Sequence, residues 1–333
     1  MLFGIRLIGY LGDANRLIEL GVLAEKSGFD FCWFPHDPFM RNPWTLMAAL
    51  AKLTNKIKLG VVGTNPYTTD LSEIATHMAT LQELSAGRGV LGFGLHTEEM
   101  VRWLGYDASD IEGRLREGVS ILRALFRGEN AGYKGKFYKW SDECYLRFTP
   151  QTKTPIYVAG YSRSTHALSG ELGDGSLPML TPPDAADYVV RCVKEGAEKA
   201  GKRFDEIDIA GLCWASISES SKVAEETLKR MIAYFGPYLE AEALAKINLT
   251  PHDFDEIKKL VSRGYIDKAI CLVNDSMLRL AIIGGAKELI EAVDKLRKVG
   301  ISQISIGGPL GPDPEEAIQI VGKKVIPYFK ENV

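Results

Sequence analysis

Residues 57–99, IKLGVVGTNPYTTDLSEIATHMATLQELSAGRGVLGFGLHTEE, decide the fold of this chain. They begin with a short apolar run, 57–62, which is rich in β-branched residues and therefore typical of a strand. Asp70, with Glu73 three residues later, is typical of the start of a helix. A second apolar run, 89–94, follows a Gly-Arg-Gly turn. A helix between two such strands predicts a parallel βαβ unit.

The same alternation of strand and helix continues along the rest of the 333 residues. Segments with apolar residues at helical spacing lie between the apolar runs. Eight strands, each followed by a helix, predict an α/β fold of the (β/α)8 TIM-barrel type, with a doubly wound sheet as the alternative. The predicted strands are 2–8, 29–34, 57–62, 89–94, 155–159, 175–180, 207–217 and 301–307.

Two segments interrupt the alternation. Residues 128–150 are rich in aromatic side chains and predict a hairpin-like excursion over the barrel. Residues 234–277 are helical in pattern and predict an inserted helical segment between the seventh and eighth strands. Because the chain has no repeat and no low-complexity linker, we expect a single TIM-barrel domain, 1–333, with these two insertions.

The composition is that of a globular protein, with 46% hydrophobic and 25% charged residues and a net charge of -3. The absence of a basic run argues against a nucleic-acid partner, and no apolar run reaches the about 18 residues of a membrane span. The five cysteines form no CxxC pair, and the five histidines have no metal-ligand spacing. We therefore expect a cytoplasmic protein without a metal site or a disulfide framework.

Polar residues follow the predicted strands at the end where barrel enzymes carry their chemistry. His36 and Asp37 follow the second strand and could transfer protons or hydrogen-bond a cofactor. Alternatively, they only complete a turn between two prolines. His96 and Glu98 follow the fourth strand, where the acidic residue could instead complement a helix dipole.

Arg6 lies within the first predicted strand, on the face opposite Phe3 and Ile5. A buried arginine needs a partner, and Asp37 at the end of the neighbouring strand is the obvious candidate. The sequence leaves open whether Arg6 contacts a ligand or forms a structural ion pair.

The segment Gly160-Tyr161-Ser162-Arg163 joins the fifth strand to a helix. Backbone amides at a helix start, together with a hydroxyl and a guanidinium, suit a phosphate group. The alternative is a plain turn between strand and helix.

Several motifs, spread over nearly the whole chain, carry a family resemblance. The motifs are LGVVGTNPYT at 59–68, ATLQELSAGR at 79–88, VLGFG at 90–94, ALSGELGDG at 167–175, GGAKEL at 284–289 and GPLGPD at 308–313. Taken together, they resemble the bacterial-luciferase-like superfamily, and in particular its branch that uses the deazaflavin coenzyme F420. They are similar to the 5,10-methylenetetrahydromethanopterin reductases of methanogenic archaea.

The resemblance implies where a coenzyme would bind. The deazaflavin would lie in the barrel mouth against a bulge at Val62 and Gly63 that contains a non-prolyl cis peptide bond. Thr64 and Asn65 would contact its ring, and the segment from Gly160 to Arg163 would meet its phosphate.

The resemblance also implies an activity. The chain would be a cytoplasmic archaeal oxidoreductase of methanogenesis and one-carbon metabolism, a homodimer or homotetramer. It would transfer a hydride between reduced F420 and a small substrate, expected to be a pterin of the methylenetetrahydromethanopterin type. An FMN-dependent monooxygenase and a non-catalytic cofactor-binding paralogue are the alternatives.

Three positions depart from the pattern of those reductases. Arg6 replaces a carboxylate on the first strand, His36-Asp37 reverses the usual order, and His96 with Thr97 replaces a Gly-Asp pair. Because arginine stays protonated near neutral pH, Arg6 cannot donate a proton as a carboxylic acid does. Asp37, His96 or Glu98 is therefore expected to take that role, unless the substrate differs.

Overall fold

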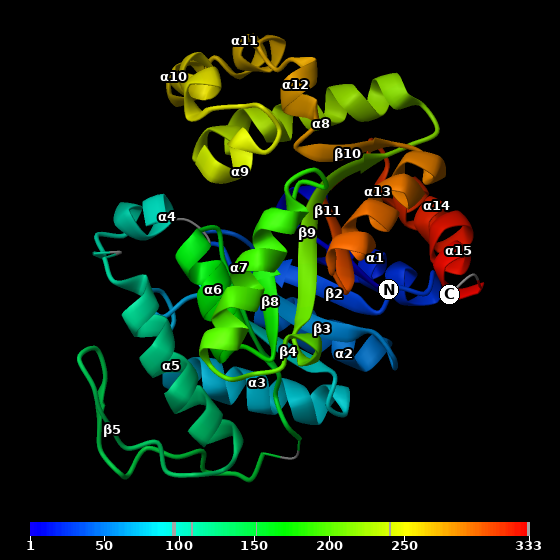
Figure 1. Cartoon of the computed structure of the whole chain (residues 1–333). Coiled ribbons are helices and arrows are strands. Elements are labelled where there is room, and N and C mark those ends of the chain that lie inside the picture. Colours follow the sequence, from blue (N-terminus) through cyan, green and yellow to red (C-terminus); the bar gives the residue numbers. More distant parts are fainter. Residues whose placement is uncertain (95–97, 108, 151, 240, 332–333) are drawn as a thin grey trace.

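Eight parallel strands close into a ring in the computed structural model, which describes residues 1–94, 98–107, 109–150, 152–239 and 241–331 (Figure 1). The first strand pairs with both the second and the last, and a two-residue pairing between β8 and β9 closes the ring. A closed ring confirms the barrel and excludes the doubly wound sheet, which has two open edges. The strands are β1 (Leu2–Arg6), β2 (Phe31–Pro35), β3 (Lys58–Thr64), β4 (Gly89–Gly94), β7 (Ile156–Gly160), β8 (Gly175–Pro178), β9 (Asp208–Ile217) and β11 (Gln303–Leu310).

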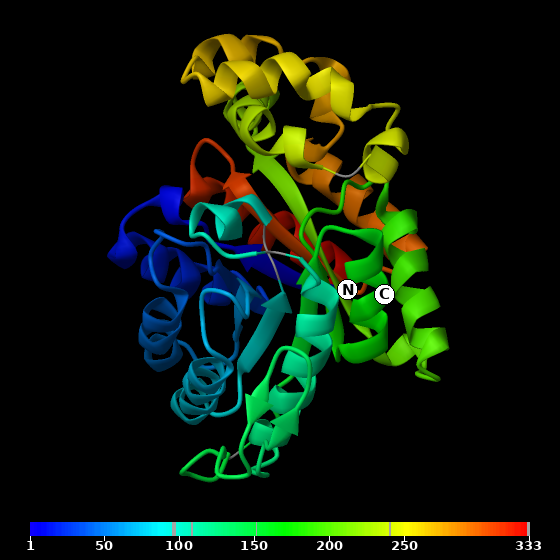
Figure 2. The same cartoon turned by 90° about the vertical axis from the view of Figure 1, so that its left-hand side faces the viewer.

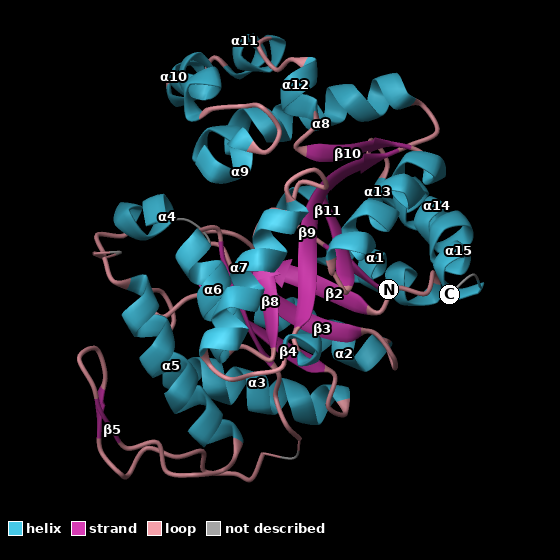
Figure 3. Cartoon of the chain, viewed as in Figure 1, coloured by secondary structure: helices cyan, strands magenta, loops and turns pink. Residues whose placement is uncertain are grey.

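Helices surround the strands on the outside of the ring (Figure 3). Asp13, Asp70 and Asp313 cap helices as their positions in the sequence predict, because each side chain accepts a hydrogen bond from a backbone N–H of the first turn. The helices next to the barrel are α1 (Ala14–Lys26), α2 (Pro43–Leu53), α3 (Leu71–Ser85), α4 (Glu98–Trp103), α5 (Ile111–Phe126), α6 (Arg163–Leu172), α7 (Ala186–Lys199), α8 (Ser221–Phe235), α13 (Ala286–Val299), α14 (Pro314–Ile320) and α15 (Ile326–Glu331).

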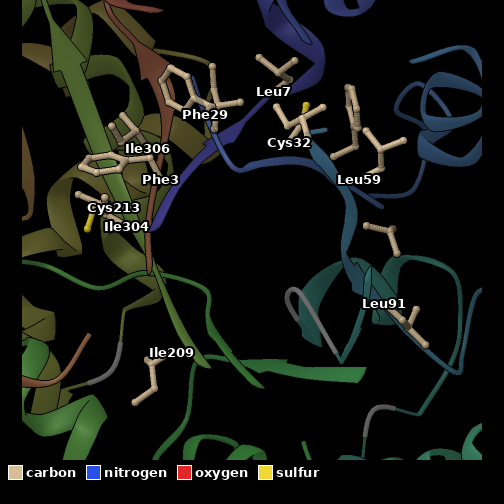
Figure 4. Close-up of a cluster of buried hydrophobic side chains, with 14 of the residues drawn as sticks. Phe3, Leu7, Phe29, Cys32, Leu59, Leu91, Ile209, Cys213, Ile304 and Ile306 are labelled. Carbon is tan, nitrogen blue, oxygen red and sulfur yellow. The ribbon is translucent and has the colours of Figure 1, made fainter. Parts of the chain in front are cut away.

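The strand pleat divides the buried side chains into two sets. One set packs between the ring and the helices, and the other fills the inside of the ring. Trp33 and Val62 belong to the inner set and are fully buried. Figure 4 shows members of the outer set on strands around the ring, among them Phe3, Cys32, Leu59, Leu91, Cys213 and Ile304.

The two irregular segments lie at opposite ends of the molecule (Figures 1 and 2). Strands β5 (Tyr133–Lys134) and β6 (Lys139–Trp140) form the predicted hairpin. The inserted segment is helical, as predicted. It contains α9 (Ala241–Ala245), α10 (Asp255–Ser262), α11 (Ile266–Cys271) and α12 (Asp275–Leu278). That the chain forms one domain stays a prediction.

The structure differs from the sequence prediction in two elements. Strand β10 (Ala281–Gly284) was not predicted, and it pairs with the last four residues of β9 beyond the ring. The residues Thr181 to Asp184 predict a helix start, with a capping hydroxyl and proline in the first turn. The helix instead begins at Ala186, because the two prolines at 182 and 183 precede it in a turn. Within the described ranges, none of the helices is both long enough and apolar enough to span a membrane.

Candidate active site

The end of β3 carries the bulge that the sequence predicts. Val61 pairs with Leu91 and Thr64 pairs with Phe93, so that Val62 and Gly63 together face a single residue of β4. That residue is Gly92, where a Cβ atom would lie only 2.3 Å from the carbonyl oxygen of Val61. The bulge therefore requires a glycine opposite it.

The prediction of a cis peptide bond between Val62 and Gly63 is wrong. The cis bond that occurs among the described residues joins Gly308 and Pro309. Gly63 has a φ of 76°, a conformation open to glycine, so the extra residue is accommodated with a trans peptide bond.

Thr64 and Asn65 follow the bulge and are almost completely buried, with exposed fractions of 0% and 2%. The side-chain oxygen of Asn65 accepts hydrogen bonds from the backbone N–H groups of Tyr67 and Thr68, both at 3.0 Å. Asn65 thus shapes the loop after β3, and its amide nitrogen is the group that it can offer to a ligand.

His36 lies behind the bulge. Its backbone N–H donates to the carbonyl of Val62 at 3.0 Å, and its Nδ1 lies 3.2 Å from the hydroxyl oxygen of Thr64. Its ring meets Trp44 of α2 edge-on at a centroid distance of 6.0 Å. Burial lowers the pKa of His36, Asp37 opposes this shift and His77 adds to it. His36 is therefore a neutral imidazole near pH 7 that supports Thr64.

Arg6 faces the inside of the ring. A Cβ atom on Gly4 would lie 3.1 Å from Trp33 Nε1 and 3.3 Å from the hydroxyl of Ser305, so the face of β1 that contains Gly4 and Arg6 points inward. The exposed fraction of Arg6 is only 9%.

The charges of Arg6 and Asp37 both act on Tyr161, which follows β7. Burial raises the pKa of the Tyr161 hydroxyl to about 12, while Arg6 lowers it and Asp37 raises it further. A guanidinium and a carboxylate thus both influence the phenol hydroxyl at the mouth, and the direct pairing of Arg6 with Asp37 stays a prediction.

The segment after β7 has the predicted turn. Ser162 caps α6 by accepting a hydrogen bond from the backbone N–H of Thr165 at 3.1 Å. A Cβ on Gly160 would lie 2.2 Å from the Thr165 hydroxyl, so the turn needs glycine there. Arg163 is exposed and pairs with Glu195 of α7 at 3.0 Å. The phosphate contact of this segment stays a prediction.

For two of the predicted site residues, the structure gives no side-chain contacts. His96 lies outside the described residues, and Glu98 is described only as the first residue of α4. Among the described residues, no group of three or more His, Cys, Asp or Glu side chains could hold a metal ion.

The sequence reasoning missed a set of buried hydroxyls. Thr181, Ser216 and Ser305 are at most 1% exposed, and their hydroxyl oxygens have no hydrogen-bond partner within the described part of the chain. Such groups are rare in proteins and mark places where a ligand can bind. The available signal was a lone serine in a strand that is otherwise apolar, as in IAGLCWASI and QISIGG.

Two curated proteins of one name are similar to this chain over nearly its full length. A 5,10-methylenetetrahydromethanopterin reductase of Methanopyrus kandleri is 28% identical over 99% of both chains. A protein of the same name from Archaeoglobus fulgidus is 29% identical over 92% of this chain and 94% of its own.

A solved structure has the same fold. The coenzyme F420-dependent tetrahydromethanopterin reductase from Methanopyrus kandleri superimposes with a TM-score of 0.91 at 27% identity, over 98% of this chain and 99% of its own. A family model described as luciferase-like monooxygenase matches residues 4–303. The chain therefore belongs to the luciferase-like monooxygenase family, which is the superfamily that its sequence motifs resemble.

Proposed function

We propose that this protein is a coenzyme F420-dependent oxidoreductase that transfers a hydride between reduced deazaflavin and a pterin of the methylenetetrahydromethanopterin type. The observation that carries the proposal is the full-length similarity to the Methanopyrus kandleri reductase, with a TM-score of 0.91 at 27% identity. The similarity extends over 98% of this chain and 99% of that chain, so it includes the segments that follow the barrel strands.

The residues at the mouth fit such a coenzyme. The bulge at Val62 and Gly63 presents backbone to the inside of the ring, where an added side chain at Gly92 would collide. The buried hydroxyls of Thr181 and Ser216 lack partners among the described residues and could bond the polar edges of a planar ring. When bound, the coenzyme would supply the hydride chemistry, which no side chain of the protein can perform.

The side chains would position the reactants and move a proton. Asp37 is our candidate to hold the proton, because its charge acts on Tyr161 at the mouth, as the charge of Arg6 also does. His36 would orient Thr64 at the bulge and not exchange protons with the substrate. His96 and Glu98 stay candidates for the same proton.

Titration of the purified protein with F420, followed by fluorescence, tests the coenzyme. Oxidation of reduced F420 in the presence of 5,10-methylenetetrahydromethanopterin then tests turnover. Asp37→Asn keeps the size of the side chain but cannot carry the proton, so kcat should fall by about 100-fold. The affinity for F420 should change less than about twofold. Asp205→Asn, at an exposed ion pair with Arg203, is the matched control and should leave both unchanged.

Two results would contradict the proposed function, and a third would contradict the role of Asp37. Binding of FMN in place of F420 would favour a flavin-dependent monooxygenase. Tight F420 binding without turnover would favour a non-catalytic cofactor-binding protein. Full activity of Asp37→Asn would remove Asp37 from the reaction and leave His96 or Glu98.

The proposal includes a cytoplasmic location and a homodimer or homotetramer. Both follow from the family resemblance, and light scattering of the purified protein measures the second. Neither bears on the assignment of the coenzyme.

A further inference from the structure

The turn that follows β2 contains a residue type that its backbone disfavours. The N–H of Met40 donates to the carbonyl of Asp37 at 3.3 Å, so residues 37–40 form a β-turn with Pro38 second and Phe39 third. Phe39 has a φ of 65°. Proline followed by a positive φ is the pattern of a type II turn, whose third position favours glycine or asparagine. The presence of phenylalanine at this position, where its positive φ is unfavourable, therefore requires an explanation.

Packing does not supply that explanation. The exposed fraction of Phe39 is 84%, the highest among the large exposed hydrophobic residues of the described chain. Met40 and Tyr10 are also exposed, at 53% and 54%. Local rules of sequence and structure are broken mainly where function requires it.

The loop that carries Phe39 is held in place. Arg41 donates a hydrogen bond of 2.8 Å to the carbonyl of Gly9, which joins the loop after β2 to the loop after β1. The sulfur of Met40 lies 3.6 Å from the position that a Cβ on Gly9 would occupy. The loops after β1 and β2 therefore lie side by side, and we call their three large exposed side chains, Tyr10, Phe39 and Met40, the rim patch.

The rim patch borders the candidate active site. Both loops follow the carboxyl ends of barrel strands, which is the end where barrel enzymes bind their substrates. The turn itself starts at Asp37, whose charge acts on Tyr161 at the mouth. The ring of Phe39 is thus attached, two residues away, to the carboxylate proposed to carry the proton.

We propose that the rim patch is a docking surface for the planar ring system of the substrate, with the ring of Phe39 stacking on it. The inference rests on the proposed function, because that function supplies a substrate with a flat ring. Three side chains are far fewer than the about 20 residues that each subunit contributes to a stable interface, so the patch suits a small planar molecule better than a second copy of the chain.

The substitution Phe39→Gly distinguishes the contribution of the aromatic ring to substrate binding from the contribution of the backbone conformation to stability. Phe39→Gly suits the positive φ, so the melting temperature should not fall. The KM for 5,10-methylenetetrahydromethanopterin should rise about tenfold, the effect of losing one aromatic stacking contact and its buried area. kcat and the affinity for F420 should stay within about twofold. Phe39→Tyr and Phe39→Trp keep a ring and should restore KM.

The matched control is Phe148→Ala, which removes an exposed aromatic side chain from the excursion at 128–150. It should leave KM unchanged. An unchanged KM in Phe39→Gly would overturn the inference. A lower melting temperature together with a smaller oligomer in light scattering would also overturn it, because the patch would then be a subunit contact.

Calorimetric titration with tetrahydromethanopterin keeps the test independent of turnover. Wild-type protein should bind the pterin about tenfold more tightly than Phe39→Gly. A wild-type protein that binds F420 but no pterin would overturn the docking surface and leave the coenzyme assignment standing. One that binds pterin through Phe39 but no F420 would support the rim patch and overturn the proposed function.

Discussion

The two ends of the barrel differ in whether their buried polar groups have hydrogen-bond partners. At the amino-terminal end of the strands, the carboxylate of Asp208 accepts hydrogen bonds from the Tyr157 hydroxyl at 2.6 Å and from the Gln303 amide at 3.0 Å. The Gln303 oxygen accepts in turn from Trp33 Nε1 at 2.9 Å. At the mouth, the hydroxyl of Ser216 is fully buried and has no partner among the described residues.

This difference separates groups that stabilise the fold from groups that are available to a ligand. A buried polar group with all its partners contributes to stability, and one without a partner costs free energy until something binds it. Barrel enzymes divide in the same way, with stability at the amino-terminal end and chemistry at the carboxyl-terminal end. Substitutions at the two ends should therefore have different effects on the free energy of unfolding.

The largest expected effect is at the amino-terminal end. Asp208→Ala should lower the free energy of unfolding by about 3 kcal/mol, because Tyr157 and Gln303 lose their shared acceptor. Ser216→Ala at the mouth should be neutral or stabilising, because it removes a hydroxyl that lacks a partner. Urea unfolding measures both variants. Equal losses in the two variants would break the comparison.

A smaller effect is expected at the bulge. Gly92→Ala should cost about 2 kcal/mol, because the new Cβ would lie 2.3 Å from the Val61 carbonyl oxygen and displace the bulge. The affinity for F420 should fall in the same variant. Gly9→Ala is the stability control, since the nearest atom to its new Cβ is 3.6 Å away. A stable Gly92→Ala variant with normal coenzyme affinity would remove the bulge from the site.

The smallest effect is on the pH dependence of stability near the mouth. His166 of α6 is 4% exposed, and burial lowers its pKa to about 4, while a hydrogen bond to the backbone of Tyr161 opposes the shift. Below pH 6.5 the imidazole of His166 binds a proton in the unfolded chain but not in the folded protein. The free energy of unfolding therefore falls as the pH falls. Between pH 7 and pH 5.5 the loss should be about 1 kcal/mol.

Unfolding of His166→Gln at both pH values checks this expectation, because the variant should lose that part of the pH dependence. His252→Gln is the control, since the His252 side chain is 90% exposed. If the two variants respond alike to pH, His166 is not the group that titrates.

The sequence predicts the scaffold better than the site. Apolar runs of five to seven residues identify most strands, and Asp13, Asp70 and Asp313 mark helix starts, because these signals are local. Strand β10 escapes prediction because it has only four residues and gains its partner from the distant end of β9.

The site depends on the directions in which side chains point, and these do not follow from the order of residues in the sequence. His36 and Asp37 are adjacent in the sequence and were predicted as a pair. His36 contacts Thr64 and Trp44, whereas Asp37 acts on Tyr161 across the mouth, since successive residues of an extended chain point to opposite sides. The bulge at Val62 and Gly63 likewise depends on the φ of one glycine, which no motif specifies.

The short pairing that closes the ring has a consequence for local opening. Strands β8 and β9 pair at two positions, whereas β1 and β11 pair at five. The hydrogen bond from Tyr157 on β7 to Asp208 on β9 passes over this seam and joins the strands on either side of β8. We expect hydrogen exchange to show local opening of the barrel first at this seam, and the Tyr157–Asp208 hydrogen bond to raise the free energy of that opening.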